Sequence, residues 1–275
     1  MEGVITGRTP KPRRVVLAGM KGIGKSTWAA GAPDPIFIPT EDGLDDIGPS
    51  RYAKAETFDE VFNRFKRLGE DEHGYRTAVV DSLDALERLI FAEVCKSKGV
   101  ENIEDIGYAK GYTFALDWWR RIIACCDYLR NERGMNVILI AHTKVDKFED
   151  PENANYDYWT LQLHKHATSF ITQWADEVFF AKSKLAIRST KEGFGREKAR
   201  AMDLGERVIM ASHKPSHVAK NRLDMPDEIP FPKVGGWDVY AKYIQAHHDS
   251  KPIAAAAPPV AESKESKGRK KAVAS

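Results

Sequence analysis

The chain has 275 residues, of which 42% are hydrophobic and 30% are charged, and its formal net charge is +2. This length suits one large domain or one domain with additions, and the apolar content is enough for a sizeable core. A balance so close to neutral excludes a globally basic surface, so any contact with DNA has to come from local patches.

The composition also bears on the compartment. The N-terminus lacks a long apolar core and no apolar run approaches ~18 residues, so we expect neither a signal peptide nor a membrane span. The cysteines Cys95, Cys125 and Cys126 are odd in number, and two of them are adjacent in a helical pattern, where they cannot easily bridge. Reduced thiols of this kind predict a cytoplasmic location.

Three parts of the chain differ in composition. Residues 1–12 are rich in glycine, proline and basic side chains, which predicts a flexible N-terminal arm. Residues 13–250 carry the periodic apolar patterns of a folded core. Residues 251–275 change from alanine and proline to serine, lysine and glutamate, which predicts a disordered basic tail.

The first predicted strand, Val15–Gly19, leads directly into a glycine-rich loop. That loop reads Gly19-Met20-Lys21-Gly22-Ile23-Gly24-Lys25-Ser26-Thr27, and a segment that can begin a helix follows it. The pattern G-x-x-x-x-G-K-[ST] between a strand and a helix is that of a loop that wraps nucleotide phosphates. It predicts binding of ATP or GTP.

The chemistry of such a loop explains its residue types. The glycines let the backbone turn tightly, so that its N–H groups point inward and form a nest for anions, and the helix adds its positive end. Lys25 would reach the β- and γ-phosphates, Ser26 would place its hydroxyl on Mg²⁺, and Thr27 would support the α-phosphate side. The alternative is a chance loop of glycine and lysine.

Short apolar runs and amphipathic segments alternate after this loop. Predicted strands cover Ile36–Ile38, Thr77–Asp81 and Asn136–His142. Predicted helices cover Phe58–Leu68, Leu83–Lys98 and Phe114–Arg133, and a polar excursion covers 99–112. These spacings imply βαβ units, so we predict an α/β fold with a mainly parallel sheet covered by helices.

The sequence after His142 has a different character. Residues 143–168 are rich in polar and aromatic side chains and show little periodicity. Glu177–Arg188 and Glu206–His213 predict two strands joined by a charged segment, which indicates an antiparallel C-terminal extension. Trp237–His247 predicts a short final helix.

Asp81 ends an apolar strand, at the edge of a parallel sheet where ligands gather. A carboxylate there can order Mg²⁺ together with Ser26, directly or through water. The alternative is an ordinary cap for the helix that begins at Leu83. We favour the metal role, because a phosphate-binding loop needs an acidic partner on a neighbouring strand.

Hydrolysis needs a group that orients or deprotonates water. The acids Glu41, Asp42, Asp45 and Asp46 follow the second strand, and Glu41 lies nearest the strand end. His142 lies at the tip of the fourth strand, at the same edge, and can sense the γ-phosphate by hydrogen bonding. The alternatives are a solvated acidic turn and a partly buried histidine with a backbone partner.

Four segments together resemble the RecA-like P-loop ATPase core, most closely the phage-encoded, AAA-type ATP-binding proteins of single-strand annealing and recombination. They are V-V-L-A-G-M-K-G-I-G-K-S-T, I-F-I-P-T-E-D-G-L-D, T-A-V-V-D-S-L-D and V-I-L-I-A-H-T-K, and a weaker fifth is H-V-A-K-N-R-L-D-M-P. The resemblance spans Arg13 to Pro232. It implies ATP rather than GTP, and no guanine-reading N-K-x-D motif follows the fourth strand.

The resemblance also assigns roles to single residues. An acid shortly after the second strand activates the attacking water in this family, and Glu41 matches it. The family usually carries a glutamine at the fourth strand tip, linking the γ-phosphate to the DNA loops, and His142 stands in its place. Lys220 and Arg222 match cations that reach the ATP of a neighbouring subunit in RecA and stabilise charge there. Their alternative is a basic surface turn.

DNA-binding candidates follow from the same resemblance, because in this fold the loops after the fourth and fifth strands face the axis of the oligomer. Cations and aromatic side chains interleave in the first loop, which suits single-stranded nucleic acid. These candidates are Lys144, Lys147, Tyr158, Trp159 and Lys165. Acids dilute the charge, and local packing is the alternative. A second basic segment is also a candidate for DNA binding, with Lys191, Arg196, Lys198 and Arg200. The alternative is a solvated hairpin tip.

The resemblance therefore implies an enzyme that hydrolyses ATP with Mg²⁺, binds single-stranded DNA and acts in recombination or single-strand annealing. It implies a homo-oligomer, as a ring or a filament, with a single-strand-binding protein as a candidate partner. A helicase or translocase motor shares every nucleotide-binding residue and is the first alternative. A nucleotide-gated scaffold or loader that hardly hydrolyses ATP is the second.

Overall fold

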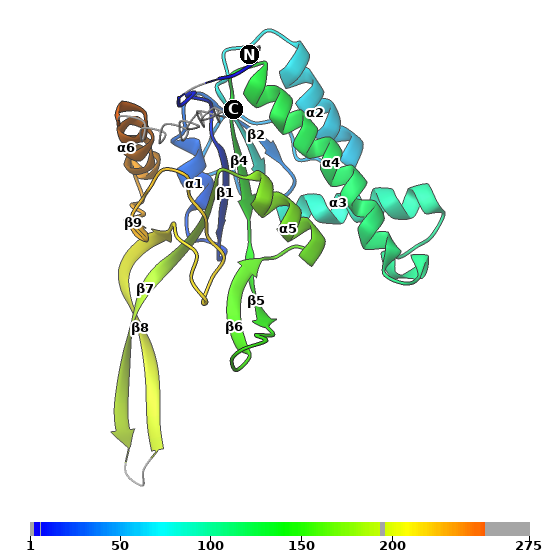
Figure 1. Ribbon diagram of the computed structural model, residues 1–275. Coiled ribbons are helices and arrows are strands. Elements are labelled where there is room, and N and C mark those ends of the chain that lie inside the picture. Colours follow the sequence, from blue (N-terminus) through cyan, green and yellow to red (C-terminus); the bar gives the residue numbers. More distant parts are fainter. Residues whose placement is uncertain (1–2, 6, 193–195, 251–275) are drawn as a thin grey trace, which may run out of the picture.

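A seven-stranded sheet in the order β2-β3-β4-β1-β7-β8-β9 forms the centre of the molecule (Figure 1). The computed structural model describes residues 3–5, 7–192 and 196–250, with the backbone alone for 186–192 and 196–203. The parallel strands are β2 (Pro35–Pro39), β3 (Thr77–Asp81), β4 (Asn136–Ala141), β1 (Arg14–Gly19) and β7 (Glu177–Glu192). The antiparallel strands are β8 (Arg196–Met210) and β9 (Glu228–Pro230). The predicted fold class is confirmed.

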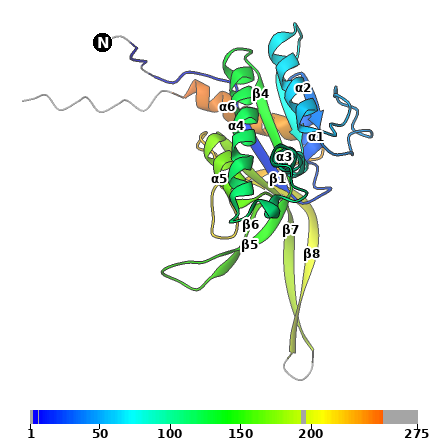
Figure 2. The ribbon, with the colours of Figure 1, turned by 90° about the vertical axis from the view of Figure 1, so that its right-hand side faces the viewer.

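Helices cover both faces of this sheet (Figures 1 and 2). One face carries α2 (Phe58–Glu70), α3 (Leu83–Lys98), α4 (Lys110–Asn131) and α5 (Lys165–Trp174). The other face carries α1 (Lys25–Ala30) and α6 (Gly236–Asp249). The helix predictions therefore hold, although α4 begins before Phe114, inside the segment predicted as an excursion, after the 3₁₀ turn Ile103–Ile106.

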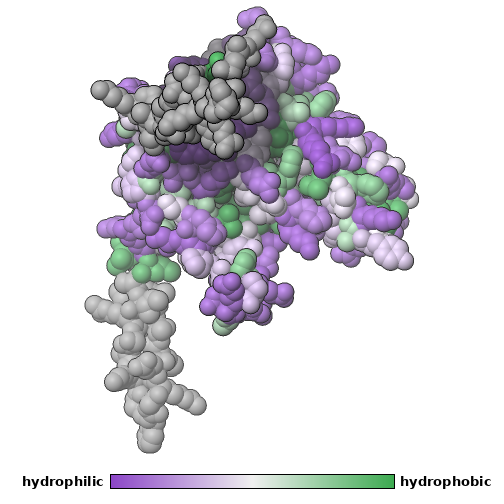
Figure 3. Space-filling model, in the orientation of Figure 1, coloured by the Kyte–Doolittle hydropathy of each residue, from purple (hydrophilic) through white to green (hydrophobic). Residues whose placement is uncertain are grey.

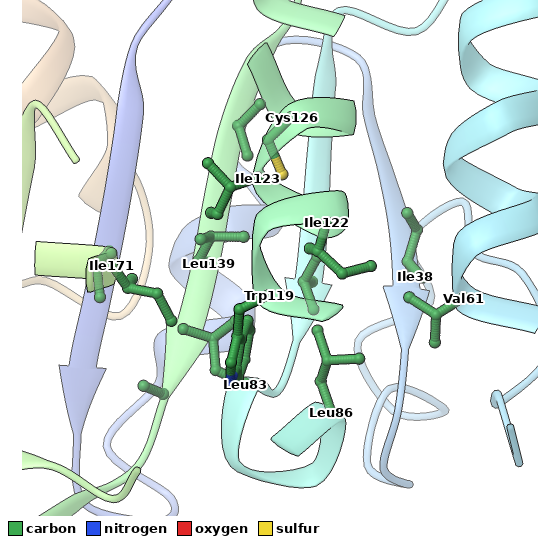
Figure 4. Packing of buried hydrophobic residues seen from close by; sticks show 14 of the residues in the cluster. Ile38, Val61, Leu83, Leu86, Trp119, Ile122, Ile123, Cys126, Leu139 and Ile171 are labelled. Carbon is green, nitrogen blue, oxygen red and sulfur yellow. The ribbon is translucent and has the colours of Figure 1, made fainter. Parts of the chain in front are cut away.

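Strand β1 shows why its sequence is apolar without interruption. Successive side chains of a strand point to opposite faces, and both faces are covered here. Val16 and Ala18 enter the core beneath α2 to α5, and Val15 and Leu17 enter the core beneath α1 and α6. Figure 4 shows the first core, where Trp119 of α4 packs beside Leu83 and Leu139. Both cores fix the strand ends that carry the site.

Residues 143–168, which show little periodicity in the sequence, are nevertheless regular in structure. Strands β5 (Thr143–Phe148) and β6 (Tyr156–Leu161) form a separate hairpin, and α5 follows it. The pattern escaped detection because its apolar partners face each other across the hairpin, as Phe148 faces Tyr156. In α5, the buried side chains are Ala167 and Ile171, too few for a clear helical stripe.

The β7–β8 arm is longer than the sequence predicts. Strand β8 begins at Arg196 rather than Glu206, and β7 continues to Glu192, so the charged segment lies largely in the strands. Main-chain pairing runs along the whole arm, whereas its charged sequence lacks the alternating apolar pattern by which a strand is recognised. The arm projects from the body (Figure 1), and Figure 3 shows an apolar patch at its root, where Leu185 and Leu204 are exposed.

The predicted ends of the chain are described only in part. In the N-terminal arm, Arg8 donates a hydrogen bond to the carbonyl oxygen of His247 at 2.7 Å, so the arm contacts the end of α6. The predicted tail, 251–275, lies outside the described residues. The boundaries of the predicted arm, core and tail stay predictions.

Candidate nucleotide-binding site

The glycine-rich loop joins the end of β1 to the start of α1 with left-handed turns. Gly22 has a φ of 74° and Gly24 a φ of 105°, a region that glycine enters without strain. A Cβ at Gly24 would lie 2.7 Å from Nη1 of Arg207. The backbone angles therefore favour glycine at this position, whereas the guanidinium of Arg207, at the end of a flexible side chain, could move aside.

Lys25 is the first residue of α1 and is only 6% exposed. Its ammonium donates hydrogen bonds to the carbonyl oxygens of Gly19 and Met20, each at 3.0 Å. Burial lowers the pKa of Lys25, while the nearby charges of Asp81 and Glu41 act in the opposite direction. The ammonium thus folds back on its own loop, where an incoming anion can exchange for the carbonyl oxygens.

Ser26 and Asp81 meet although they lie far apart in the sequence. The Ser26 hydroxyl donates a hydrogen bond of 2.6 Å to Oδ2 of Asp81, at the end of β3. Burial raises the pKa of Asp81, and the hydrogen bond from Ser26 acts against that rise. Asp81 therefore turns to the phosphate loop rather than to the first turn of α3. A buried carboxylate beside a hydroxyl fits the oxygen ligands that Mg²⁺ takes.

Glu41 follows β2, and hydrogen bonds between the ends of β2 and β3 hold its backbone. The Thr40 amide donates to the carbonyl oxygen of Asp81 at 2.8 Å. Its neighbours in the acidic cluster contact cations instead: Asp42 contacts Lys54 at 3.1 Å and Asp45 contacts Arg51 at 2.7 Å. Glu41 turns toward His142, with 3.9 Å between Oε1 and Nε2.

His142 follows β4 and is 6% exposed. Its Nδ1 lies 2.9 Å from Oδ1 and 3.0 Å from Oδ2 of Asp84. Burial would raise the pKa of Asp84, but the hydrogen bonds and charge of His142 outweigh burial and lower the pKa to about 2. Our sequence reasoning missed Asp84. The available signal was an acid in the first turn of a helix that leaves the ligand-binding edge of the sheet.

Most of these residues line one cavity of about 340 Å³. Its lining residues are Lys21, Gly22, Gly24, Lys25, Ser26, Thr27, Glu41, Asp42, Gly43, Ile47, Asp81 and His142. The remaining members of the predicted loop contribute main-chain oxygens nearby: Gly19 and Met20 accept from Lys25, and Ile23 accepts from Arg207 at 2.6 Å. The cavity unites an ammonium, a hydroxyl and carboxylates, the groups that a magnesium-bound triphosphate needs.

Arg207 is a second residue near the loop that our sequence reasoning missed. It comes from β8, and its guanidinium also lies over the ring of Phe231, at 5.1 Å from the centroid. Because its approach to Ile23 depends on the register of β8 against β7, no local sequence pattern marks it. Arg207 ties the root of the long arm to the phosphate loop.

The predicted DNA-binding residues separate into two groups in the β5–β6 hairpin. Trp159 stacks on Phe180, with 6.0 Å between ring centroids, so it packs against the body. Tyr158 lies on the other face, where its ring contacts that of Phe148 at 6.2 Å. Phe148 also stacks on Tyr156 at 5.2 Å. That face, with Phe148, Tyr156 and Tyr158, is called the aromatic face below.

The predicted lysines also differ in their surroundings. Lys144 donates a hydrogen bond to the carbonyl oxygen of Leu163 at 2.9 Å, which braces the base of the hairpin. Lys147 is exposed near the hairpin tip, and Lys165 is exposed at the start of α5. The side chains of Lys191, Arg196, Lys198 and Arg200 lie outside the described residues.

Glu87 holds the chain shortly after β6, at the base of the same hairpin. It is buried on α3, one turn beyond Asp84, and its two oxygens accept the His164 amide at 3.1 and 3.0 Å. Burial raises the pKa of Glu87 to about 7, against the lowering effects of that amide and of Lys144. Helix α3 thus contacts both arms of the hairpin at its base, through Asp84 at His142, just before β5, and through Glu87 at His164, shortly after β6.

Lys220 and Arg222 lie at the opposite, amino edge of the parallel sheet. The Lys220 ammonium donates to the carbonyl oxygens of Thr172, Gln173 and Ala175, at 3.1, 3.0 and 2.7 Å, and so caps the end of α5. Arg222 lies 3.3 Å from Asp176. Within one chain these cations are remote from the cavity, so a role at a neighbouring subunit's site stays a prediction.

Comparison with known proteins defines the class. The family model described as an AAA domain matches residues 11–223, more than half of the chain, so the chain belongs to this family. Membership supports nucleotide binding and ATPase activity, typically with Mg²⁺.

A curated relative is the SPbeta prophage-derived uncharacterized protein YorG of Bacillus subtilis (strain 168). The two are 24% identical over 139 residues, which cover 48% of this chain and 42% of that protein. The match thus spans less than half of the relative's length. None of the helices in the described part of the chain has the length and apolarity that crossing a bilayer needs.

Proposed function

We propose that this protein is a RecA-like, single-stranded-DNA-binding ATPase that acts in DNA recombination or single-strand annealing in the cytoplasm. The observation that carries the proposal is the single cavity that brings Lys25, Ser26 and Asp81 together with Glu41 and His142. A hairpin with an aromatic face begins one residue after His142. The prophage-derived relative supports a phage setting for this activity.

ATP binding would depend on the phosphate loop. Its inward N–H groups and the Lys25 ammonium supply positive charge where the β- and γ-phosphates carry negative charge. Lys25 already sits among main-chain oxygens, so a phosphate oxygen replaces one polar partner with a charged one. This exchange strengthens as charge develops on the phosphate oxygens during transfer.

Ser26 and Asp81 would hold Mg²⁺. When bound, the metal neutralises phosphate charge and orients the γ-phosphoryl group. The 2.6 Å hydrogen bond between these two side chains keeps a hydroxyl and a carboxylate oxygen adjacent before any ligand arrives. Burial disfavours the lone charge of Asp81, so its environment selects for a cation partner.

Glu41 would orient the attacking water and accept its proton as the bond to the ADP leaving group breaks. Its carboxylate shares the cavity with Lys25 and Asp81 and faces the ring of His142. His142 would contact the γ-phosphate region through Nε2 and, because β5 starts directly after it, would link nucleotide state to the hairpin.

Single-stranded DNA would contact the aromatic face of the hairpin. Its rings offer stacking surfaces for bases, and Phe148 is 43% exposed. Lys147 is exposed near the tip on the opposite face and would contact the phosphate backbone where the strand passes the tip, whereas Trp159 would support the hairpin. We infer that Phe148, Tyr156 and Tyr158, rather than Trp159, carry the stacking.

We further propose a homo-oligomer, as a ring or a filament on DNA, with a single-strand-binding protein as a candidate partner. In this arrangement Arg222 is the better candidate for a neighbouring subunit's site, because it is half exposed. Lys220 is already bound by three carbonyl oxygens of its own chain.

The test is ATP turnover measured with and without single-stranded DNA, followed by strand-annealing and duplex-unwinding assays side by side. We expect turnover that single strands increase, annealing activity and no unwinding. Unwinding would favour a helicase or translocase motor. Binding of ATP without turnover would favour a nucleotide-gated scaffold.

The hairpin has its own test. Tyr158→Ala is expected to weaken binding of a fluorescent oligothymidylate by about tenfold at fixed salt, since one stacked base contributes ~1–3 kcal/mol. Tyr128→Ala is the matched control. Tyr128 is also an exposed tyrosine (51%), and it lies near the C-terminal end of α4, outside the hairpin. Equal affinity of both variants would remove the aromatic face from the DNA-binding surface.

A further inference from the structure

Asp84 makes contacts that a purely structural acid does not need. It is 7% exposed in the first turn of α3. Its Oδ1 accepts the main-chain amide of His142 at 3.1 Å, which already anchors the end of β4. Both of its oxygens also lie within 3.0 Å of the ring Nδ1, so the carboxylate fixes the ring as well as the backbone.

This contact determines which ring nitrogen faces the cavity. The carboxylate of Asp84 accepts from Nδ1–H, which assigns the proton of a neutral imidazole to that nitrogen. Nε2 then points to Glu41 at 3.9 Å. Because Nδ1 keeps its proton when the ring is charged, Nε2 has the same direction in both protonation states.

Glu41, His142 and Asp84 thereby form one row. Their ligand atoms all lie within 4.8 Å of one another. Glu41 follows β2, His142 follows β4 and Asp84 lies on the helix after β3, so the row crosses the carboxyl edge of three strands. Arg88 approaches Asp84 from the solvent side at 3.9 Å and is 65% exposed.

We propose that Asp84 is a positioning residue for ATP hydrolysis, which holds the imidazole of His142 with Nε2 toward Glu41 and the phosphate cavity. The proposal rests on the proposed ATPase function. Asp84 itself does not line the cavity, and its effect on the reaction runs through the ring of His142.

The experiment compares Asp84→Asn, Asp84→Ala and His142→Asn, alone and combined, by steady-state ATP turnover. We expect Asp84→Ala to lower kcat by about tenfold or more, in the range found when a carboxylate behind a functional histidine is removed, with KM changed by less than about twofold. Asp84→Asn keeps one acceptor oxygen, so we expect a smaller loss. The double variant Asp84→Ala with His142→Asn is expected to match His142→Asn alone.

Arg88→Ala is the matched control, because it removes the charged neighbour of Asp84 on the same helix and leaves the ring contact intact. We expect it to keep the wild-type kcat. Losses that add up in the double variant would overturn the proposal, because Asp84 would then act by a route other than His142. An unchanged kcat in Asp84→Ala would overturn it as well.

A spectroscopic measurement separates this proposal from the ATPase proposal. In ¹⁵N-histidine-labelled full-length protein at about pH 8.5, we expect His142 to show a protonated Nδ1 and a bare Nε2. Asp84→Ala is expected to redistribute the two tautomers, even if the protein hydrolyses no ATP. An unchanged tautomer in Asp84→Ala would refute the positioning role. Failure of wild-type turnover would refute only the ATPase proposal.

Discussion

At the amino edge of the parallel sheet, Glu177 is buried between Arg13 and Tyr240, and its Oε2 accepts from the Tyr240 hydroxyl at 2.7 Å. At the carboxyl edge, Asp81 is also buried, but its hydrogen-bond partner is the neutral hydroxyl of Ser26. Burial raises the pKa of both carboxyls, against the opposing effects of Arg13 and Ser26 respectively. The same class of buried acid is thus matched by a cation at one edge and held beside a cavity at the other.

The basic side chains at the two edges of the sheet differ in the same way as the acids. Arg14 of the amino edge pairs with Asp176 at 2.9 Å, so charge meets charge inside the fold. Lys25 of the carboxyl edge contacts two main-chain oxygens, and the carboxylates of Asp81 and Glu41 share its cavity. Buried charge by itself therefore does not mark a functional site. Charges that border a common cavity and are not neutralised within hydrogen-bond distance do.

Lys25→Ala tests the difference between the two edges of the sheet, and it has the largest expected effect. Removing the ammonium deletes the charge that holds the β- and γ-phosphates, so we expect ATP turnover to fall by at least about 10³-fold. Thermal unfolding should change little, since burial already disfavours the charge of Lys25 and the lost contacts are two main-chain carbonyl oxygens, one of them on the exposed Met20. Lys66→Ala, an exposed lysine on α2, is the control. Normal turnover in Lys25→Ala would disprove the site.

Glu41→Gln tests the choice within the acidic cluster. A glutamine keeps the shape but cannot accept a proton, so we expect kcat to fall by about 10²- to 10³-fold with nucleotide binding retained. Asp45→Asn is the matched control, because Asp45 is paired with Arg51 and its side chain is 89% exposed. Turnover assays and calorimetric ATP binding check both variants. An equal loss in Asp45→Asn would assign the cluster a general electrostatic role.

Glu177→Ala addresses the amino edge. The change leaves Arg13 and the fully buried Tyr240 hydroxyl without their shared acceptor, so we expect the free energy of unfolding to fall by about 4 kcal/mol. At temperatures where the variant stays folded, ATP turnover per folded molecule should match the wild type. Urea unfolding and turnover together give the result. Glu177→Gln, which keeps an acceptor oxygen, should lose less stability. A turnover defect at equal folded fraction would mean that both edges serve the reaction.

How far the sequence predicts the site depends on how local each relation is. The strand–loop–helix around Lys25 is one continuous pattern, so the phosphate loop could be recognised directly. Asp81 followed from a topological rule, that the ends of parallel strands meet at one edge, and the choice of Glu41 needed the family resemblance as well. Arg207 could not be predicted, because its position depends on the register of a long antiparallel arm.

The fold shows the same limit. Strands β1 to β4 are continuous apolar runs, and their burial on both faces follows from that pattern. The β5–β6 hairpin is stabilised by side-chain pairs across the two strands, such as Phe148 with Tyr156. No pattern of neighbouring residues in the sequence predicts these pairs. Asp84 lay within reach of sequence reasoning, but its role depends on the ring of His142, 58 positions away.

Glu87 gives a further test of the difference between the two edges of the sheet, and its expected effect is the smallest. It lies near the carboxyl edge, and its partner is the main-chain amide of His164. Burial raises its pKa from 4.5 to about 7, with the amide and Lys144 opposing that rise. Below about pH 4.5 the carboxyl is protonated in both states. Between the two pKa values the folded state keeps a proton that the unfolded state releases, so stability falls as pH rises.

Glu87→Gln removes this titration. Relative to the wild type, we expect the variant to gain up to about 3 kcal/mol of unfolding free energy between about pH 4.5 and pH 8, by about 1.4 kcal/mol per pKa unit. Urea unfolding across that range gives the difference, and Glu101→Gln at an exposed position should show none. Parallel stability curves for Glu87→Gln and the wild type would mean that Glu87 is ionised in the fold. Its charge would then be stabilised by its surroundings, as the charge of Glu177 is at the amino edge.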